Sequence, residues 1–347
     1  MIYSLDETLN DQKNLNKLCR DRSLNTSEIF SANAYYGNDA IYKLYTGLPN
    51  NYPLKIVIPH GIVLGKNYVW EAECTAPLPA VYCYDDERLK EYQQTTNKKL
   101  FLTASPFVLV TELLKETPSP RKGTLFFPYH STHHISVESD YSQMAQRLLE
   151  LDEKFQPVTV CIYWKDYILG NAKPFIERGI PVVSAGHMHD PHFLFRFFHL
   201  CSINKYSSGN EFGSHLFYSI KAGCSYFHLP GLGYNLSASS EVICRDGPPV
   251  TDDYENTLID MFSDPHSSPT QEQMAFVNYH LGTQYLKKPD QLRKELLDLE
   301  YLDKYYLSWF PLQTKHKVLI PPYFYRSGYR LGEKIYRTVY KHLNTDC

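Results

Sequence analysis

The sequence predicts an α/β protein with two Rossmann-like lobes that face a central cleft, followed by a helical tail. The 347 residues suffice for two domains of ordinary size. Short apolar runs alternate with helical stretches, which is typical of α/β proteins with mostly parallel sheets. The alternation occurs in two consecutive series, and a polar segment at 115–123, which carries two prolines, separates them. We therefore expect one lobe over 1–118, a second over 124–310 and a C-terminal helix over 311–347.

The individual elements follow from the same pattern. In the first series, apolar runs predict strands at 54–59, 80–84 and 100–103. In the second series, they predict strands at 124–128, 158–163, 181–185 and 224–229, with a helix over 141–155. The segment 207–215 is interpreted as a loop that opens a short helix over 216–220. Beyond 247–249 the pattern turns helical, notably over 270–281 and 289–306.

Composition excludes several classes of protein. Hydrophobic residues make up 43% and charged residues 21%, as in soluble globular proteins, and no apolar run approaches the length of a membrane span. The first residues lack the basic flank and apolar core of a signal peptide, so we expect a cytoplasmic protein. The net charge of -3 argues against a nucleic-acid partner, whose binding surface would be basic.

The charge of the C-terminal tail differs from that of the rest of the chain. Residues 315–342 contain seven Lys or Arg and one acidic residue, Glu333, interleaved with tyrosines. A basic helix with an aromatic side is suited to the inner, anionic surface of a membrane. The alternative is a terminal helix that packs on the other lobe while its basic side chains remain solvated.

The segment 207–215, Ser-Ser-Gly-Asn-Glu-Phe-Gly-Ser-His, is the strongest candidate for a ligand site. Ser and Asn cap helices, glycines let backbone approach a ligand, and the amides at a helix start attract phosphate. The segment therefore predicts a seat for a nucleotide or nucleotide-sugar. An ordinary capped helix is the alternative.

Further polar residues follow the predicted strands, where ligands bind in open α/β sheets. Nine of the fourteen histidines lie between 130 and 228. Lys165 is suited to neutralise a diphosphate. Asp190 is suited to act as a base or nucleophile, tuned by its neighbours His187 and His189. The same histidines, with His130, His133, His134 and His192, offer ligands for a hydrolytic zinc or manganese centre, which is the main alternative.

Four parts of the chain together resemble bacterial GT-B glycosyltransferases of capsule and lipopolysaccharide synthesis. They are 59–61, the 130–131 strand end, the 186–190 strand end, and 210–215 followed by Tyr218 and Gly223. The resemblance covers 124–230 best and is nearest to transferases of CMP-linked acidic sugars, such as Kdo and sialic acid. The His-Pro pair of sialyltransferases is not present in the expected form, so a uridine or guanosine donor stays open.

The resemblance implies a division of labour between the lobes. The second lobe would hold the nucleotide-sugar, the first would receive a cell-envelope glycan or glycolipid through His60 and Gly61, and the terminal helix would cross back to the first lobe. Asp190 would be the catalytic carboxylate, and no cofactor or essential metal is expected. The residues that would hold the donor are His130, Ser131, Ser208, Asn210, Gly213, Ser214 and His215. A nucleotide- or glycan-binding module without activity is a third hypothesis.

Overall fold

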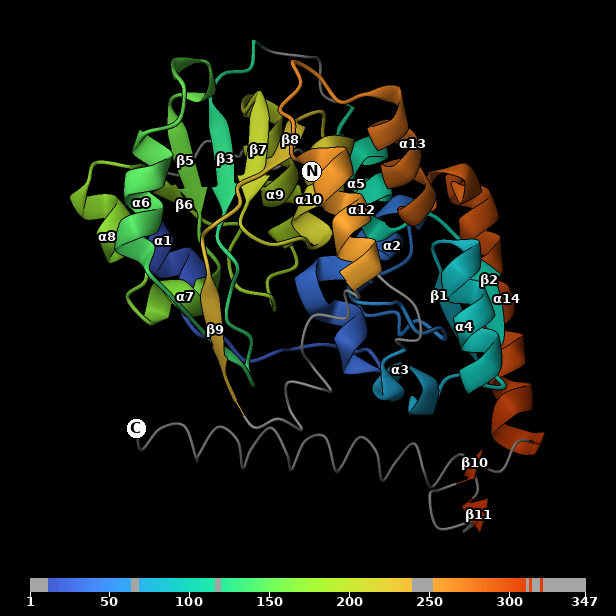
Figure 1. The fold of residues 1–347 in the computed structure, drawn as a ribbon. Helices are drawn as coiled ribbons and strands as arrows, with labels where there is room; N and C mark the ends of the chain where they lie inside the picture. Colours follow the sequence, from blue (N-terminus) through green and yellow to red (C-terminus); the bar gives the residue numbers. More distant parts are fainter. Residues whose placement is uncertain are drawn as a thin grey trace.

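The computed structural model describes residues 12–63, 69–115, 120–238 and 252–309, together with 312–313 and 319–320. It is a mixed α/β structure with parallel sheets, as predicted (Figure 1). The larger sheet has five parallel strands in the order β6-β5-β3-β7-β8. The strands are β3 (Thr124–Phe127), β5 (Val158–Cys161), β6 (Val182–Val183), β7 (Tyr206–Gly209) and β8 (Ser225–His228). Counted along the chain, this is the 3-2-1-4-5 order of a doubly wound fold.

Helices cover both faces of this sheet, so successive side chains of a strand enter different cores. On β3, Leu125 and Phe127 pack with α9 (Phe193–Ile203) and α10 (Ser214–Lys221). Phe126 packs on the opposite face, with α6 (Tyr141–Leu149) and α8 (Lys173–Glu177). Strands buried on both faces explain why the sequence shows continuous apolar runs there.

The smaller sheet lies in the first half of the chain. Its strands β1 (Ala80–Cys83) and β2 (Lys99–Leu102) are parallel, and α4 (Asp86–Thr95) connects them. The carboxylate of Asp85 caps α4 by accepting a hydrogen bond from the amide of Arg88 at 2.7 Å. The strand predicted at 54–59 is reduced to one parallel bridge between Val57 and Val81.

The two sheets share one continuous hydrophobic core. The helices α2 (Asn38–Thr46) and α5 (Pro106–Leu114) lie between them (Figure 1). Tyr42 stacks on Tyr82 of β1, and Phe107 of α5 stacks on Tyr218 of α10. The first helix, α1 (Gln12–Cys19), packs against α7 (Trp164–Ile168) and so belongs with the larger sheet, although it falls within the predicted first lobe.

The remaining elements complete the protein around these sheets. The helix α12 (Asp252–Phe262) lies near β8, α13 (Gln271–His280) packs on α10, and α14 (Pro289–Trp309) runs beside β2 (Figure 1). Thr270 and Gln273 form a capping box that begins α13. The short elements are η1 (Ser31–Gly37), α3 (Glu71–Thr75), η2 (Glu153–Phe155), η3 (Thr283–Tyr285) and two antiparallel pairs, β4 (Ser136–Ser139) with β9 (Tyr234–Ser237) and β10 (Leu312–Gln313) with β11 (Leu319–Ile320).

Two predicted elements differ from the structure. The helix predicted over 141–155 ends at Leu149, and the separate turn η2 follows it. The start of the predicted loop 207–215 is strand β7, paired on both sides, so the loop itself begins at Asn210.

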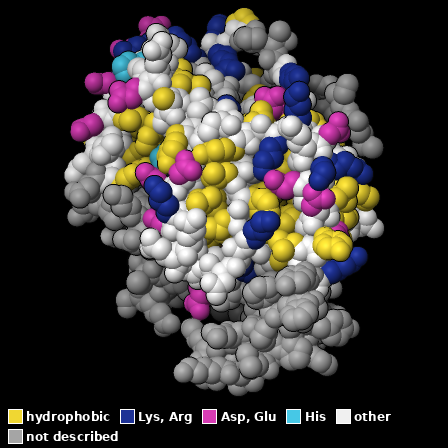
Figure 2. All heavy atoms as spheres, turned by 90° about the vertical axis from the view of Figure 1, so that its right-hand side faces the viewer, with side chains coloured by type: hydrophobic (Ala, Val, Ile, Leu, Met, Phe, Trp, Pro, Cys, Tyr) yellow, Lys and Arg dark blue, Asp and Glu magenta, His cyan; other side chains and the backbone are white. Residues whose placement is uncertain are grey.

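The surface that includes α14 carries apolar side chains among charged ones (Figure 2). A groove of about 360 Å³ lies there, lined only by residues of β2 and α14, and it contains no predicted site residue. None of the described helices combines the length and apolar character required to cross a lipid bilayer. Most of the C-terminal helix predicted over 311–347 lies outside the described residues, and the described parts of it, 312–313 and 319–320, are the strands β10 and β11 and not helix.

Candidate functional site

The strand order of the larger sheet changes direction between β3 and β7. In doubly wound sheets, the carboxyl ends of the strands at such a switch point open onto a crevice that binds ligands. Here the loops after β3 and β7 are joined, because the amide of Tyr129 donates to Asn210 Oδ1 at 2.8 Å. Asn210 Nδ2 also donates to the Leu232 carbonyl at 3.1 Å. The predicted donor residue Asn210 therefore holds three segments together at the switch point.

The helix α10 begins after β7, at this switch point, and contacts the first half of the chain there. Gly213 is its N-cap and provides no side-chain cap. Ser214 Oγ accepts a hydrogen bond from the amide of Ile62 at 3.0 Å. A Cβ atom on Gly61 would lie 3.3 Å from the same oxygen. The predicted acceptor-side loop and the predicted donor helix are thus in direct contact.

His215 lies against residues of three strands, β3, β7 and β8. Its ring lies 5.1 Å from the ring of Phe127 and 5.9 Å from that of Tyr226, and a Cβ atom on Gly209 would lie 2.7 Å from its Nε2. This buried Nε2 has no hydrogen-bond partner among the described residues. Burial, reinforced by His130 and His228, lowers the pKa of His215 to about 3, so the ring is neutral at physiological pH.

The other predicted donor residues lie in different environments. Ser131 is fully buried, and its amide and hydroxyl donate to the two carboxylate oxygens of Asp166 at 3.0 and 2.8 Å. Ser208 is also fully buried, and its hydroxyl has no partner among the described residues. His130 stacks on Tyr163 with ring centroids 4.2 Å apart, whereas Lys165 lies 6.0 Å from the ring centroid of Trp164. Ser131 therefore holds the loop after β3 in place through its hydrogen bonds to Asp166.

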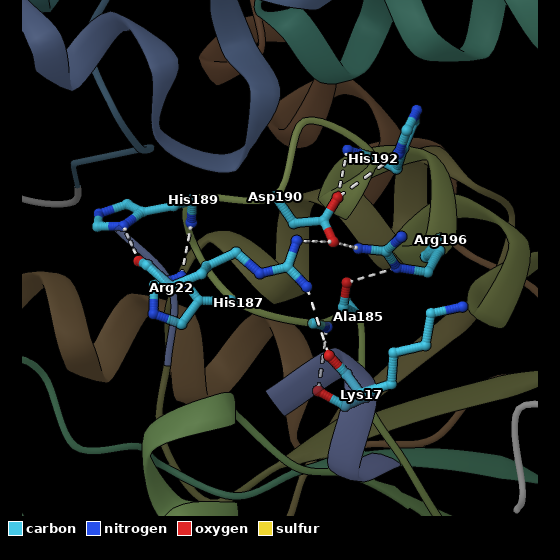
Figure 3. Close-up of polar contacts among 10 residues, drawn as sticks. Lys17, Arg22, Ala185, His187, His189, Asp190, His192 and Arg196 are labelled. Atoms are coloured by element: carbon cyan, nitrogen blue, oxygen red, sulfur yellow. Dashed lines mark hydrogen bonds and ion pairs between the residues drawn. The ribbon is translucent and has the colours of Figure 1, made fainter. Parts of the chain in front are cut away.

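Asp190 is buried between two arginines (Figure 3). Its Oδ2 lies 2.8 Å from Arg22 Nη1 and 2.7 Å from Arg196 Nη2, and its Oδ1 accepts from the amide of His192 at 2.9 Å. Burial raises the pKa of Asp190, but the hydrogen bonds from His192 and the charges of Arg196 and Arg22 outweigh it and hold the pKa well below its usual range. Both oxygens are occupied and the carboxylate is a weak base. This geometry favours a structural role over the predicted catalytic one.

The two histidines before Asp190 are fixed by the N-terminal segment (Figure 3). The amide of His187 donates to the Leu18 carbonyl at 3.0 Å, and His189 Nδ1 donates to the Arg22 carbonyl at 2.8 Å. Burial, followed by the neighbouring imidazoles, lowers the pKa of His187 to about 3. The same causes lower the pKa of His133 to about 4. Neither ring therefore carries charge near pH 7.

These imidazoles do not form a metal centre in this arrangement. The rings of His187 and His189 are 4.7 Å apart, and His133 stacks 6.0 Å from His189. Within the described ranges, however, no three His, Cys, Asp or Glu side chains converge on a common point that suits a metal ion. The hydrolase alternative gains no support from the geometry.

His60 lies in the loop after Val57, in a setting that the sequence did not reveal. Its Nδ1 is 4.0 Å from Glu73 Oε1, and its side chain is 43% exposed. The ring of Trp70 lies 5.1 Å away and that of Tyr35 lies 6.4 Å away. Tyr35 stacks in turn on His189 at 5.6 Å. An aromatic surface thus connects the acceptor-side loop with the strand-end loop after β6.

Sequence reasoning missed three charged residues that shape the site: Arg22, Arg196 and Glu73. Arg196 follows Asp190 by six residues at the start of an apolar helix, where an isolated arginine signals a buried partner. Arg22 is 168 residues from Asp190, and Glu73 is separated from His60 by a loop. No local pattern identifies those two pairs.

No protein-family profile matches the chain, and no curated protein is significantly similar to it in sequence. Among solved structures, it is similar to a UDP-GlcNAc 2-epimerase from Neisseria meningitidis bound to UDP-GlcNAc, with 11% identity, 77% of this chain and 81% of that chain covered, and a TM-score of 0.37. It is also similar to the wall teichoic acid polymerase TagF, with 11% identity, 72% and 66% covered, and a TM-score of 0.36. Similarity at this level assigns neither a family nor an activity.

Proposed function

We propose that the protein is a glycosyltransferase that moves a sugar from a nucleotide-sugar donor to a glycan or glycolipid of the cell envelope. One observation carries the proposal: the start of α10, at the switch point of the larger sheet, is in contact with the loop after Val57 through Ser214 and Ile62. A donor phosphate at the start of α10 would therefore lie beside an acceptor held by the first half of the chain.

The residues divide into those that would touch the donor and those that would shape its site. His130 follows β3, Gly213, Ser214 and His215 stand at the start of α10, and Lys165 offers a cation. Asn210 and Ser131 keep the loops after β3 and β7 in place. We retain a CMP-linked acidic sugar as the first donor to test, with UDP- and GDP-sugars as the others.

A thermal-shift panel of CMP, UDP and GDP tests the proposal. A nucleotide at a hundred times its dissociation constant stabilises the folded state by about 2.7 kcal/mol. We expect one of the three to raise Tm, and His215→Gln to reduce the shift. The control is His266→Gln, at an exposed position in the loop before α13. If no nucleotide stabilises the wild-type protein, the nucleotide-sugar hypothesis is wrong; binding without transfer to any acceptor would indicate a binding module.

A further inference from the structure

Glu73 is a buried carboxylate that forms no ion pair with a lysine or arginine in the described part of the chain. Its residue is 4% exposed, and its Oε2 accepts a short hydrogen bond from the Tyr92 hydroxyl. Among the described residues, His60 is the ionisable base within ion-pair distance of Glu73. A carboxylate beside the Nδ1 of an imidazole orients the ring and favours the tautomer in which Nδ1 carries the hydrogen, which leaves Nε2 as the acceptor. A histidine backed by a carboxylate in this way is suited to accept a proton from a substrate.

His60 has a second ring nitrogen for that task. Its Nδ1 faces Glu73 at 4.0 Å, and the side chain that carries Nε2 is 43% exposed. The side chain is partly open to solvent, unlike the neutral rings of His187 and His215, which are enclosed by their neighbours. His60 is therefore more accessible to a substrate hydroxyl than either of them.

The loop that carries His60 also has the required position. Two residues later, the amide of Ile62 donates to Ser214 Oγ at the first residue of α10. The ring centroids of Trp70 and Tyr35 lie 5.1 and 6.4 Å from that of the imidazole, both in edge-type contacts. Aromatic faces beside a polar group are suited to a sugar, whose ring offers an apolar face and hydroxyls at its edge.

We propose that His60 is the general base that deprotonates the acceptor hydroxyl, and that Glu73 is the residue that positions it. The proposal rests on the glycosyltransferase function proposed above. The acceptor is a sugar hydroxyl whose proton moves to His60 Nε2 while its oxygen forms a bond to the anomeric carbon of the donor. The bond from that carbon to the phosphate oxygen breaks, and its electron pair leaves with the nucleotide. One displacement of this kind inverts the anomeric configuration.

The test compares three variants of the full-length protein in a nucleotide-release assay, with the nucleotide-sugar that stabilises the wild type and a panel of oligosaccharide acceptors. We expect His60→Ala to lower kcat at least about 100-fold, the low end for loss of a general base. Free imidazole should restore part of that loss, which a purely structural role would not allow. Glu73→Gln should lower kcat about tenfold or more while the donor KM is unchanged. The control Glu71→Gln, exposed on the same helix α3, should behave as the wild type.

Each result distinguishes this proposal from the function on which it rests. The nucleotide-induced thermal shift is measured for every variant, and its retention shows that the donor lobe is folded. Turnover within threefold of wild type in His60→Ala, absence of imidazole rescue, or equal kcat in Glu73→Gln and Glu71→Gln would overturn the assignment alone. If the wild type neither binds nor consumes any nucleotide-sugar, the proposed function fails and this assignment fails with it.

Discussion

Replacing Asp190 with asparagine separates a structural from a catalytic role for this residue. The amide oxygen of asparagine can still accept the hydrogen bond that the backbone of His192 donates to Oδ1 at 2.9 Å. The charge is lost, however, and the guanidiniums of Arg22 and Arg196, 2.8 and 2.7 Å from Oδ2, keep no counter-charge there. Removing one partner from a fully buried ion pair costs about 3–5 kcal/mol. Because the Arg22 side chain is 26% exposed, we expect the low end of that range.

Chemical and thermal unfolding followed by circular dichroism measure this cost as a free energy and as a change in Tm. With an unfolding entropy of about 2.1 cal/mol/K per residue, 3 kcal/mol corresponds to a fall of about 4 °C in Tm. Glu177→Gln is the control, because its ion pair with Lys173 is 3.6 Å long and both side chains are mostly exposed. Such a pair contributes at most about 1 kcal/mol. A stability of Asp190→Asn equal to that of the control, together with a large loss of turnover, would refute our reasoning and restore the catalytic assignment.

Two further predictions concern stability. The pKa of His187 is about 3 in the folded protein and 6.5 in the unfolded chain, so between these values the unfolded chain binds the proton. Stability should therefore be fully present above pH 6.5 and fall below it, by up to about 1.4 kcal/mol per pH unit from this group; urea titrations from pH 8 to 5 measure the slope, which His187→Asn should reduce and His266→Asn should not. Gly37→Ala should be much more destabilising than Gly170→Ala, although both glycines have positive φ angles, of 79° and 85°. A Cβ atom on Gly37 would lie 2.2 Å from the Pro191 carbonyl oxygen, whereas nothing lies within 4 Å of one on Gly170, and equal urea midpoints would contradict this reasoning.

The sequence was sufficient to predict the elements whose signal is local. Strands β3, β5 and β8 are apolar runs buried on both faces, and the pattern placed each within a few residues. Strand β7 was not predicted, because Ser207, Ser208 and Gly209 are residue types typical of loops. Ser207 is tolerated in the sheet because its hydroxyl donates to Ser219 of α10 at 2.8 Å. The converse error occurred at 54–59, where an apolar run forms a single bridge because only Val57 pairs with β1.

In the site, too, the features with a local sequence signal could be predicted and those that depend on distant residues could not. The rule that ligands bind at strand ends depends on topology, so the sequence identified the loops after β3 and β7, which the hydrogen bond from Tyr129 to Asn210 joins. The role of a side chain within those loops depends on its partners, which are distant in sequence. The sequence predicts that Ser131 contacts the ligand, whereas in the structure its amide and hydroxyl donate to Asp166. The sequence predicts a reactive Asp190, whereas in the structure the side chain of Arg22 forms an ion pair with it. The local sequence around a carboxylate that follows a strand does not tell whether a substrate or an arginine lies next to that carboxylate.

The N-terminal segment holds the loop after β6 in place, which bears on where the general base lies. Leu18 and Arg22 hold His187 and His189 through their carbonyls, and the Arg22 side chain holds Asp190. The amide of Tyr36 donates to the Met188 carbonyl from the other side at 2.6 Å. Four consecutive residues of the loop after β6 are therefore held by hydrogen bonds. A general base needs a free ring nitrogen and access to the substrate, and His60 meets both requirements where the loop after β6 does not.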